Sequence, residues 1–417
     1  MKLKYLESKR LSWLLFFLCF ILFAVVYMTK NMFSAAMASI VEEGVMTKTQ
    51  TGAISGAFWT VYAIFQVIGG FIADKFSPPK LICIGLGGSA VANLVIYFNQ
   101  NYWVIMAAWI FSAMVQFGLW PGIFKIISTQ VSPALRSTSI FWMAFSGTLG
   151  MALSMFVASF MTHWTNNFLV SVISLLLMLA LWIVLYPILE SKMVSQEICA
   201  AEKKTNAPVS QISTKKLFWT TGLFIIIPIA GLSRMVDNAV KLLTPTMLME
   251  SYENLPAAIS TRLSVILVVF AAMGIFLGRF LRKKFTDNEM KLIAILIAVS
   301  IPLIGFTYFV GKSHYLAVLL TLSIGTVFLE GAIPFTSSFV AARYTEYGRN
   351  GTVSGIINAI QSAGNIMASF LFPAISENTS WNAIALIWVA CLFTTVVLCI
   401  CVLPAWTRFI EKSKKGV

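Results

Sequence analysis

Three charged side chains and one amide interrupt the apolar stretch between residues 231 and 247. They are Arg234, Asp237, Asn238 and Lys241. Their spacing places all four on one face of an α-helix. Hydrocarbon cannot solvate such a stripe, so it must face the interior of a helix bundle or a water-filled cavity. The pattern predicts either the wall of a polar binding cavity or a ladder of ion pairs that only orders the helix.

Three further charged residues, Lys30, Lys125 and Glu330, fall within other apolar segments. Lys30 is the only charged residue between Leu11 and Glu42. Together with the stripe they give four basic side chains against two acidic ones. An excess of positive charge in a low-dielectric medium is costly unless an anion neutralises it. We therefore expect an anionic substrate, which arginine would hold by a planar pair of donors and lysine by a point charge.

Asp237 and Glu330 are the carboxylates deep in these segments, and two interpretations of them remain open. Each could pair permanently with a basic neighbour. Alternatively, a buried carboxylate could bind and release a proton during a transport cycle and so couple transport to protons.

Uncharged side chains widen the candidate site. A second polar stripe suits hydrogen bonding to a substrate and packing between helices equally well; it comprises Ser354, Asn358, Gln361 and Asn365. Aromatic residues near the charges could stack on a carbon skeleton, although most of them are expected simply to pack. These are Tyr27, Phe33, Trp59, Tyr62, Trp120 and Trp142.

The composition indicates the elements that position these residues. Of 417 residues, 59% are hydrophobic and 11% are charged, as in a polytopic membrane protein. Twelve apolar segments are long enough to cross a bilayer as helices. They are residues 11–40, 49–73, 81–98, 102–129, 137–162, 166–189, 217–248, 262–282, 292–311, 315–341, 351–375 and 382–405.

The distribution of basic residues predicts the orientation. If the N-terminus is inside, the outside loops contain only Lys48, Arg262 and Lys312 of the 30 lysines and arginines. The net charge of +14 is then a positive-inside pattern rather than a nucleic-acid surface. We expect a multi-pass protein of the cell's inner (plasma) membrane with both termini in the cytoplasm. The six cysteines and two histidines show no ligand spacing, so neither a metal site nor a cofactor is expected.

The sequence divides into two related halves. A polar, basic linker at 190–216 separates a six-helix bundle at 1–189 from a second at 217–417, which ends in a short cytoplasmic tail. Lys30 precedes Gly70 by the same interval as Arg234 precedes Gly274. Thr138 and Gly150 are likewise spaced as Thr352 and Gly364 are. Such internal symmetry is typical of secondary transporters, whose binding sites lie between the repeats.

Short motifs make the resemblance to a known family specific. The segment GGFIADKFSPPK (69–80) resembles the signature between the second and third helices of the major facilitator superfamily. Its matching residues are Gly70, Asp74, Lys75 and Lys80. KNMFSAAMASIVEEG (30–44) and GLWPGIFK (118–125), with Trp142, Gly147 and Gly150, resemble the organophosphate:phosphate antiporter family, which carries glycerol phosphate and hexose phosphates.

The resemblance implies an all-α polytopic fold of twelve transmembrane helices in two pseudo-symmetric six-helix bundles. Lys30 falls on the family's first phosphate-binding arginine. The family's second phosphate-binding arginine aligns with Arg234 if the repeat interval is used, and with Asp237 if the alignment is anchored on Pro245. The family histidine aligns with Ser146. The candidate substrate-binding residues are therefore Lys30, Arg234, Lys241, Lys125, Tyr27, Trp120, Ser146, Asn238, Asn358 and Gln361.

Two functions follow from these residues. The first is a monomeric secondary transporter of a small organic anion, either a phosphate ester or a carboxylate, working by alternating access. Lys30 and Arg234 would clamp the anion, and phosphate exchange or proton symport would drive transport. The alternative is a non-transporting membrane sensor of a sugar phosphate with the same fold. A lipid or drug transporter would carry fewer buried charges, and no pattern of residues supports enzymatic catalysis.

Overall fold

The long apolar segments fold as α-helices, because in lipid a helix satisfies its own backbone hydrogen bonds. A computed structural model describes residues 2–75, 77–197, 218–253, 255–310, 314–344 and 350–415. The first half contains α1 (Lys9–Glu42), α2 (Lys48–Lys75), α3 (Pro78–Tyr97), α4 (Tyr102–Val115), a 3-10 turn η1 (Gln116–Gly118), α5 (Leu119–Gln130), α6 (Pro133–Ala158) and α7 (Asn166–Glu190).

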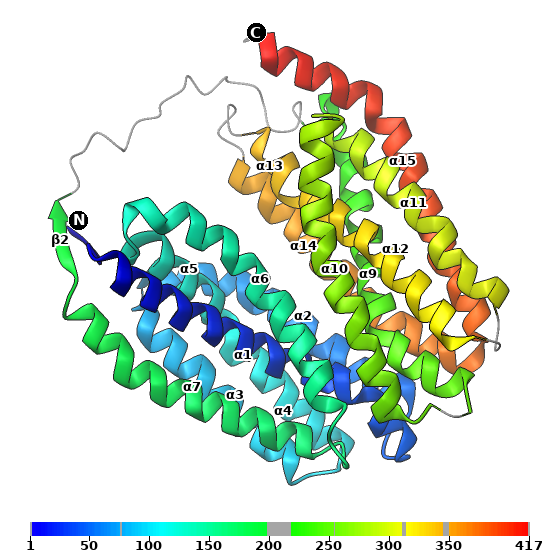
Figure 1. Cartoon of the computed structure of the whole chain (residues 1–417), viewed down its shortest axis with the longest axis horizontal. Helices are drawn as coiled ribbons and strands as arrows, with labels where there is room; N and C mark the ends of the chain where they lie inside the picture. Colours follow the sequence, from blue (N-terminus) through cyan, green and yellow to red (C-terminus); the bar gives the residue numbers. More distant parts are fainter. Residues whose placement is uncertain are drawn as a thin grey trace. The chain divides into compact units, whose positions relative to one another are not determined.

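The second half repeats this pattern of long helices. It contains α9 (Leu223–Ser251), α10 (Ala257–Lys284), α11 (Glu289–Val310), α12 (Tyr315–Pro334), a π-helix η3 (Phe335–Phe339), α13 (Val340–Ala342), α14 (Asn350–Asn378) and α15 (Trp381–Lys415). Within the described residues, each of the twelve predicted segments overlaps one of these helices or a continuous run of them (Figure 1).

Within the described residues, ten helices are long and apolar enough to cross a membrane. An eleventh span is α6, if its two parts, which are bent by 44°, count as one. At the second predicted span, α2 is a continuous helix of 28 residues but is not among these. The prediction of an all-α polytopic fold is confirmed.

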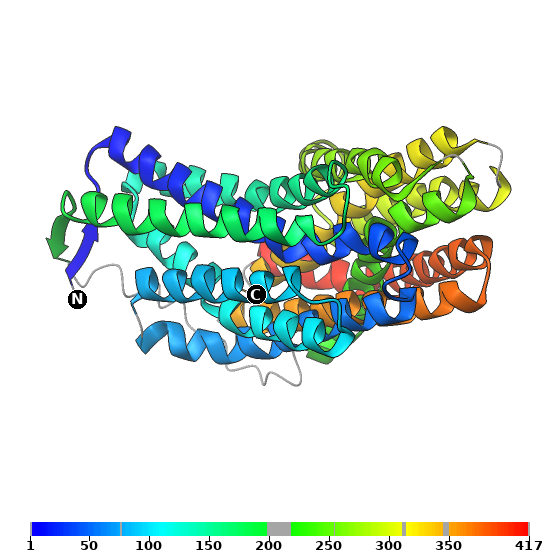
Figure 2. The same cartoon turned by 90° about the horizontal axis from the view of Figure 1, so that it is seen from below.

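The sequence did not predict a small sheet next to the first bundle. β1 (Lys2–Tyr5) and β2 (Val194–Glu197) pair antiparallel, with Lys2 opposite Glu197, beyond the ends of α1 and α7 (Figure 2). β2 lies in the predicted linker, so the linker's first residues are ordered on the bundle. The rest of the linker, from residue 198 to 216, lies outside the described residues.

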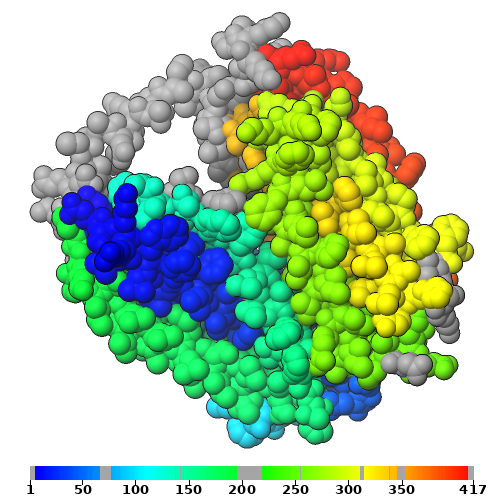
Figure 3. Space-filling model, viewed as in Figure 1, coloured from blue at the N-terminus to red at the C-terminus, as the bar shows by residue number. Residues whose placement is uncertain are grey.

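The helices belong to two compact units, and each unit is described by itself. The first contains α1 to α7 together with Ala257–Arg262, and the second contains α9 and the chain from Leu263 onward. In the first unit α1 packs mainly on α6, and α3 on α7; the surfaces of α1 and α6 adjoin in Figure 3. In the second unit α9 packs on α14, and α11 on α15. The first and fifth spans of each half therefore pair, as do the third and sixth.

Two glycines of the sequence repeat make equivalent contacts in the two units. A Cβ atom at Gly150 of α6 would lie 2.3 Å from the carbonyl oxygen of Ala24 in α1. A Cβ atom at Gly364 of α14 would lie 2.5 Å from the carbonyl oxygen of Gly231 in α9. Real Cβ atoms do not approach a carbonyl so closely, so both glycines are needed for the close contact of these helix pairs.

Replacing Gly150 by Ala is therefore expected to lower the midpoint of thermal unfolding of the purified protein. Overpacking of a tight contact typically costs about 1–3 kcal/mol, which exceeds the roughly 1 kcal/mol that alanine contributes to a helix over glycine. Gly355→Ala is the matched control, because nothing lies within 4 Å of a Cβ atom there. If both substitutions gave the same midpoint, the packing role of Gly150 would be wrong.

Candidate functional site

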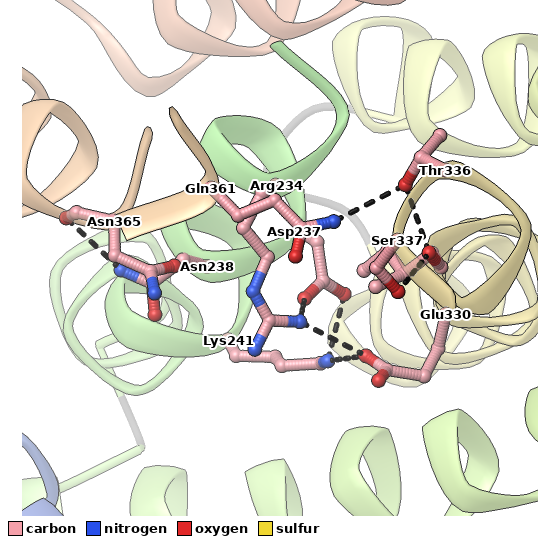
Figure 4. A network of polar contacts seen from close by, with 10 residues as sticks. Arg234, Asp237, Asn238, Lys241, Glu330, Thr336, Ser337, Gln361 and Asn365 are labelled. Atoms are coloured by element: carbon pink, nitrogen blue, oxygen red, sulfur yellow. Dashed lines mark hydrogen bonds and ion pairs between the residues drawn. The ribbon is translucent and has the colours of Figure 1, made fainter. Parts of the chain in front are cut away.

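The polar stripe on α9 forms one ion-pair network with Glu330 of α12 (Figure 4). Arg234 Nη1 lies 3.2 Å from Asp237 Oδ2, and Lys241 Nζ lies 2.7 Å from Asp237 Oδ1. Lys241 Nζ also donates a hydrogen bond to Glu330 Oε2, which lies 3.8 Å from Arg234 Nη1. Two cations and two carboxylates therefore balance each other within the second unit.

Burial differs among the four side chains of this network. The side chains of Asp237 and Lys241 are 2% and 7% exposed, whereas those of Glu330 and Arg234 are 17% and 28% exposed. Arg234 is therefore the most solvent-accessible member of the network. Glu330 is ion-paired, as the first of the two interpretations predicted; its titration during a transport cycle stays a prediction.

Uncharged polar residues extend the network toward α14. Asn238 Nδ2 donates to the carbonyl oxygen of Asn365 at 3.4 Å, and Gln361 Nε2 donates to Thr336 Oγ1 at 3.1 Å. Asn358, one turn before Gln361, is exposed. The second polar stripe thus contributes both to helix packing and to an accessible polar surface.

Thr336 belongs to the π-helix η3, which the sequence analysis did not predict. The π-helix follows Pro334, and the hydroxyls of Thr336 and Ser337 both donate to the carbonyl oxygen of Ile333. Such π-bulges inside α-helices are frequently found at functional sites. The proline followed by two hydroxyl residues is the sequence signal that was available for it.

In the first unit, Lys30 lies in an aromatic box, which we define as Tyr27, Trp59 and Tyr62. The ammonium group lies 3.6 Å from the ring centre of Tyr62, 5.0 Å from that of Tyr27 and 5.8 Å from that of Trp59. The residue is 3% exposed. Across the described part of the chain no carboxylate pairs with Lys30, and three aromatic rings surround its charge.

The other predicted residues of the first unit have contacts of different kinds. Tyr27 packs beside Gly147, where a Cβ atom would lie 3.5 Å from its ring. The hydroxyl of Ser146 donates to the carbonyl oxygen of Met143, and Trp120 packs on Phe23 with ring centres 4.6 Å apart. Lys125 is half-buried on α5. Tyr27 is the one of these residues whose contact with Lys30 is described, with its ring centre 5.0 Å from the ammonium group.

The conformational motif of the first half is only partly described. Gly70, Asp74 and Lys75 lie in the last turns of α2, but their side chains lie outside the described residues. Lys80 is exposed in the first turn of α3.

The corresponding turn of the second half contains a charge cluster that the sequence analysis missed. Arg282 lies 3.0 Å from Asp287, and the buried Glu289 accepts hydrogen bonds from Arg343 Nε at 2.8 Å and from Trp406 Nε1 at 3.0 Å. Partial burial would raise the pKa of Asp287, but hydrogen bonds from Arg343 and Arg282 outweigh it and hold the pKa below its ordinary value. The cluster ties the ends of α10, α13 and α15 to the start of α11.

Lys30 and Arg234 belong to different units. The clamp between them therefore stays a prediction from the sequence, as does the choice between Arg234 and Asp237 for the second family position.

Comparisons with known proteins agree with this architecture. The family model described as Major Facilitator Superfamily matches residues 19–369. The chain is 24% identical over 94 residues to the membrane sensor protein UhpC of Escherichia coli, covering 22% of this chain and 21% of that protein. It is 25% identical over 117 residues to a phosphoglycerate transporter protein of Salmonella typhimurium, covering 28% and 25%.

A probable sulfoacetate transporter of Cupriavidus necator, SauU, is 30% identical over 90 residues, covering 19% of this chain and 21% of that protein. The matches thus span only about a fifth to a quarter of these relatives. Among solved structures, a bacterial homologue of the human lysosomal transporter Spinster superposes with a TM-score of 0.73 at 14% identity, covering 98% of this chain and 99% of that one. That likeness shows the fold.

Proposed function

Because the chain belongs to the major facilitator superfamily, we propose that it is a secondary transporter that moves a small organic anion by alternating access. The superfamily consists of transporters, so this multi-pass membrane protein is not an enzyme. One observation carries the proposal: Lys30 is buried in a box of aromatic rings and has no carboxylate partner in the described part of the chain.

A buried ammonium without a counter-ion is costly in a low-dielectric environment. Cation–π contacts offset part of this cost, at about 2 kcal/mol each when the cation is desolvated. An anion that reaches Lys30 would supply the missing charge. The rings of Tyr27, Trp59 and Tyr62 would meanwhile contact its carbon skeleton.

The second unit contributes Arg234, the most exposed member of its network. Lys30 and Arg234 together clamp the anion, one from each unit. The surrounding candidates tune the fit of the substrate: Lys241, Lys125, Tyr27, Trp120, Ser146, Asn238, Asn358 and Gln361. Asp237 and Glu330 hold the basic residues of α9 in place, and either of them could carry a coupling proton.

The names of the relatives support the chemical class. One is a phosphoglycerate transporter and another a probable sulfoacetate transporter, so both are named for small organic anions. The protein works as a monomer in the inner membrane with both termini in the cytoplasm, and exchange with phosphate or symport with protons drives it.

A sensor that binds the same anion without moving it is the second candidate, since one relative is named a membrane sensor protein. Both candidates need the same binding residues. They differ in whether the anion crosses the membrane.

Reconstitution into liposomes separates the two candidates. Purified protein is expected to exchange radiolabelled three-carbon phosphate esters, sulfonates or carboxylates against an internal pool of the same anion, at rates well above those of empty liposomes. Ligand-induced thermal stabilisation without any flux would favour the sensor. If none of the three anions caused either stabilisation or flux, that result would contradict the proposal.

A further inference from the structure

We propose that this site selects anions with a single negative charge, such as a sulfonate or carboxylate, over the dianionic form of a phosphate ester. The inference rests on the proposed function and concerns the same site. It follows from counting the charges within each unit separately.

Among the residues of the first unit whose side chains the structure describes, no carboxylate offsets Lys30. The sequence contains no aspartate or glutamate between Asp74 and Glu190, or between Glu7 and Glu42. The membrane-spanning parts of α1 and of α3 to α7 therefore carry no acidic residue. The titratable groups in contact with the Lys30 ammonium are the phenols of Tyr27 and Tyr62.

Lys125 is the other basic residue within these spans. It lies near the end of α5 at Gln130, is half-buried, and has contacts of its own. A lysine in such a position can extend its ammonium group toward the interface. Among the described side chains of the first unit, the charge held deep is therefore that of Lys30.

The second unit adds no net charge. Arg234 and Lys241 are each bound to both Asp237 and Glu330, so the four charges cancel. Arg234 can therefore contact the anion in the proposed clamp without adding uncompensated charge, and a monoanion on Lys30 needs no further cation. A dianion would need a second uncompensated cation. Drawing Arg234 or Lys241 away to supply it would leave two buried carboxylates sharing one cation, which is strongly unfavourable.

The hydrogen-bond donors near Lys30 also favour a monoanion. The ammonium supplies at most three N–H donors, and aromatic rings surround it. On the face of α2 that carries Trp59 and Tyr62, Ser55 is buried and its hydroxyl has no hydrogen-bond partner. One cation and a few hydroxyls suit a single charge spread over two or three oxygens.

A pair of probes with the same three-carbon tail tests the proposal. Propanesulfonate is a monoanion at every working pH. Propyl phosphate loses its second proton near pH 6, so its monoanion falls from about 90% of the total at pH 5 to about 1% at pH 8. Binding of both probes to the purified full-length protein is measured by calorimetry at the two pH values.

The affinity for propyl phosphate, divided by that for propanesulfonate, is expected to fall at least tenfold from pH 5 to pH 8. The ratio cancels any titration of the protein that affects both probes. A ratio that stays constant or rises with pH would overturn the monoanion preference and leave the anion transporter intact. Failure of both probes and of propyl carboxylate to bind at either pH would contradict the proposed function itself.

Two variants assign the preference to Lys30. Lys30→Arg keeps the single charge and is expected to keep the pH dependence of the ratio. Lys30→Gln is expected to lose affinity for propanesulfonate at both pH values. Lys192→Gln, which removes an exposed lysine after α7, is the control and should match the wild type. Propanesulfonate affinity unchanged in Lys30→Gln would also overturn the inference.

Discussion

Replacing Lys30 by Gln is expected to abolish uptake of the transported anion while leaving a folded, membrane-inserted protein. The ammonium is buried in the aromatic box, and no carboxylate in the described residues faces it. Removing a charged partner of a bound anion costs about 1.5–3 kcal/mol, so uptake at low substrate concentration should fall at least tenfold. Initial rates of uptake into proteoliposomes measure the effect.

The stability of this variant gives a second readout of opposite sign. Because an unpaired buried charge is unfavourable, Lys30→Gln should unfold at the same temperature as the wild type or at a higher one. Lys192→Gln is again the control and should change neither uptake nor stability. A Lys30→Gln protein that transports at the wild-type rate would contradict the role of Lys30.

Replacing Glu330 by Gln is expected to have the opposite effect on stability from Lys30→Gln, namely a large loss. The substitution leaves Arg234 and Lys241 with Asp237 as their sole carboxylate. Breaking a buried ion pair from one side typically costs about 3–5 kcal/mol. The midpoint of unfolding of the purified protein should fall by several degrees.

A charge-balanced double variant distinguishes ion pairing from a general packing defect. Glu330→Gln combined with Lys241→Gln removes one charge of each sign, so the double variant should recover most of the lost stability. Glu253→Gln, at an exposed position, should behave as the wild type. A double variant less stable than either single one would show that the network does not act as a balanced set of charges.

Proton coupling through Glu330 has its own test. If Glu330 carries the coupled proton, Glu330→Gln should still exchange anions across the membrane but should lose accumulation driven by a pH gradient. Unchanged accumulation would exclude Glu330 as the proton carrier.

The sequence predicted what depends on helix periodicity and on hydrocarbon as a solvent. The membrane segments follow from runs of apolar residues, and the shared face of Arg234, Asp237 and Lys241 follows from the period of the helix. The repeat that relates Gly150 to Gly364 in the sequence likewise corresponds to equivalent close helix contacts in the two units.

The features that were missed depend on residues far apart in the chain. Lys30 meets Trp59 and Tyr62 because α2 packs against α1, and no local pattern specifies which rings face the ammonium. Glu289 and Arg343 join different helices in the same way. The strands β1 and β2 pair residues from the two ends of the first bundle, so the sequence of neither strand indicates its partner.

The most direct test of the account is the equilibrium affinity of the purified protein for one small anion, with Lys30 as lysine, arginine or glutamine. With propanesulfonate as the probe, Lys30→Arg should bind within about tenfold of the wild type, since each keeps one positive charge in the aromatic box. Lys30→Gln should bind at least tenfold more weakly than either. Equal affinity in all three proteins would contradict the claim that the charge of Lys30 holds the anion.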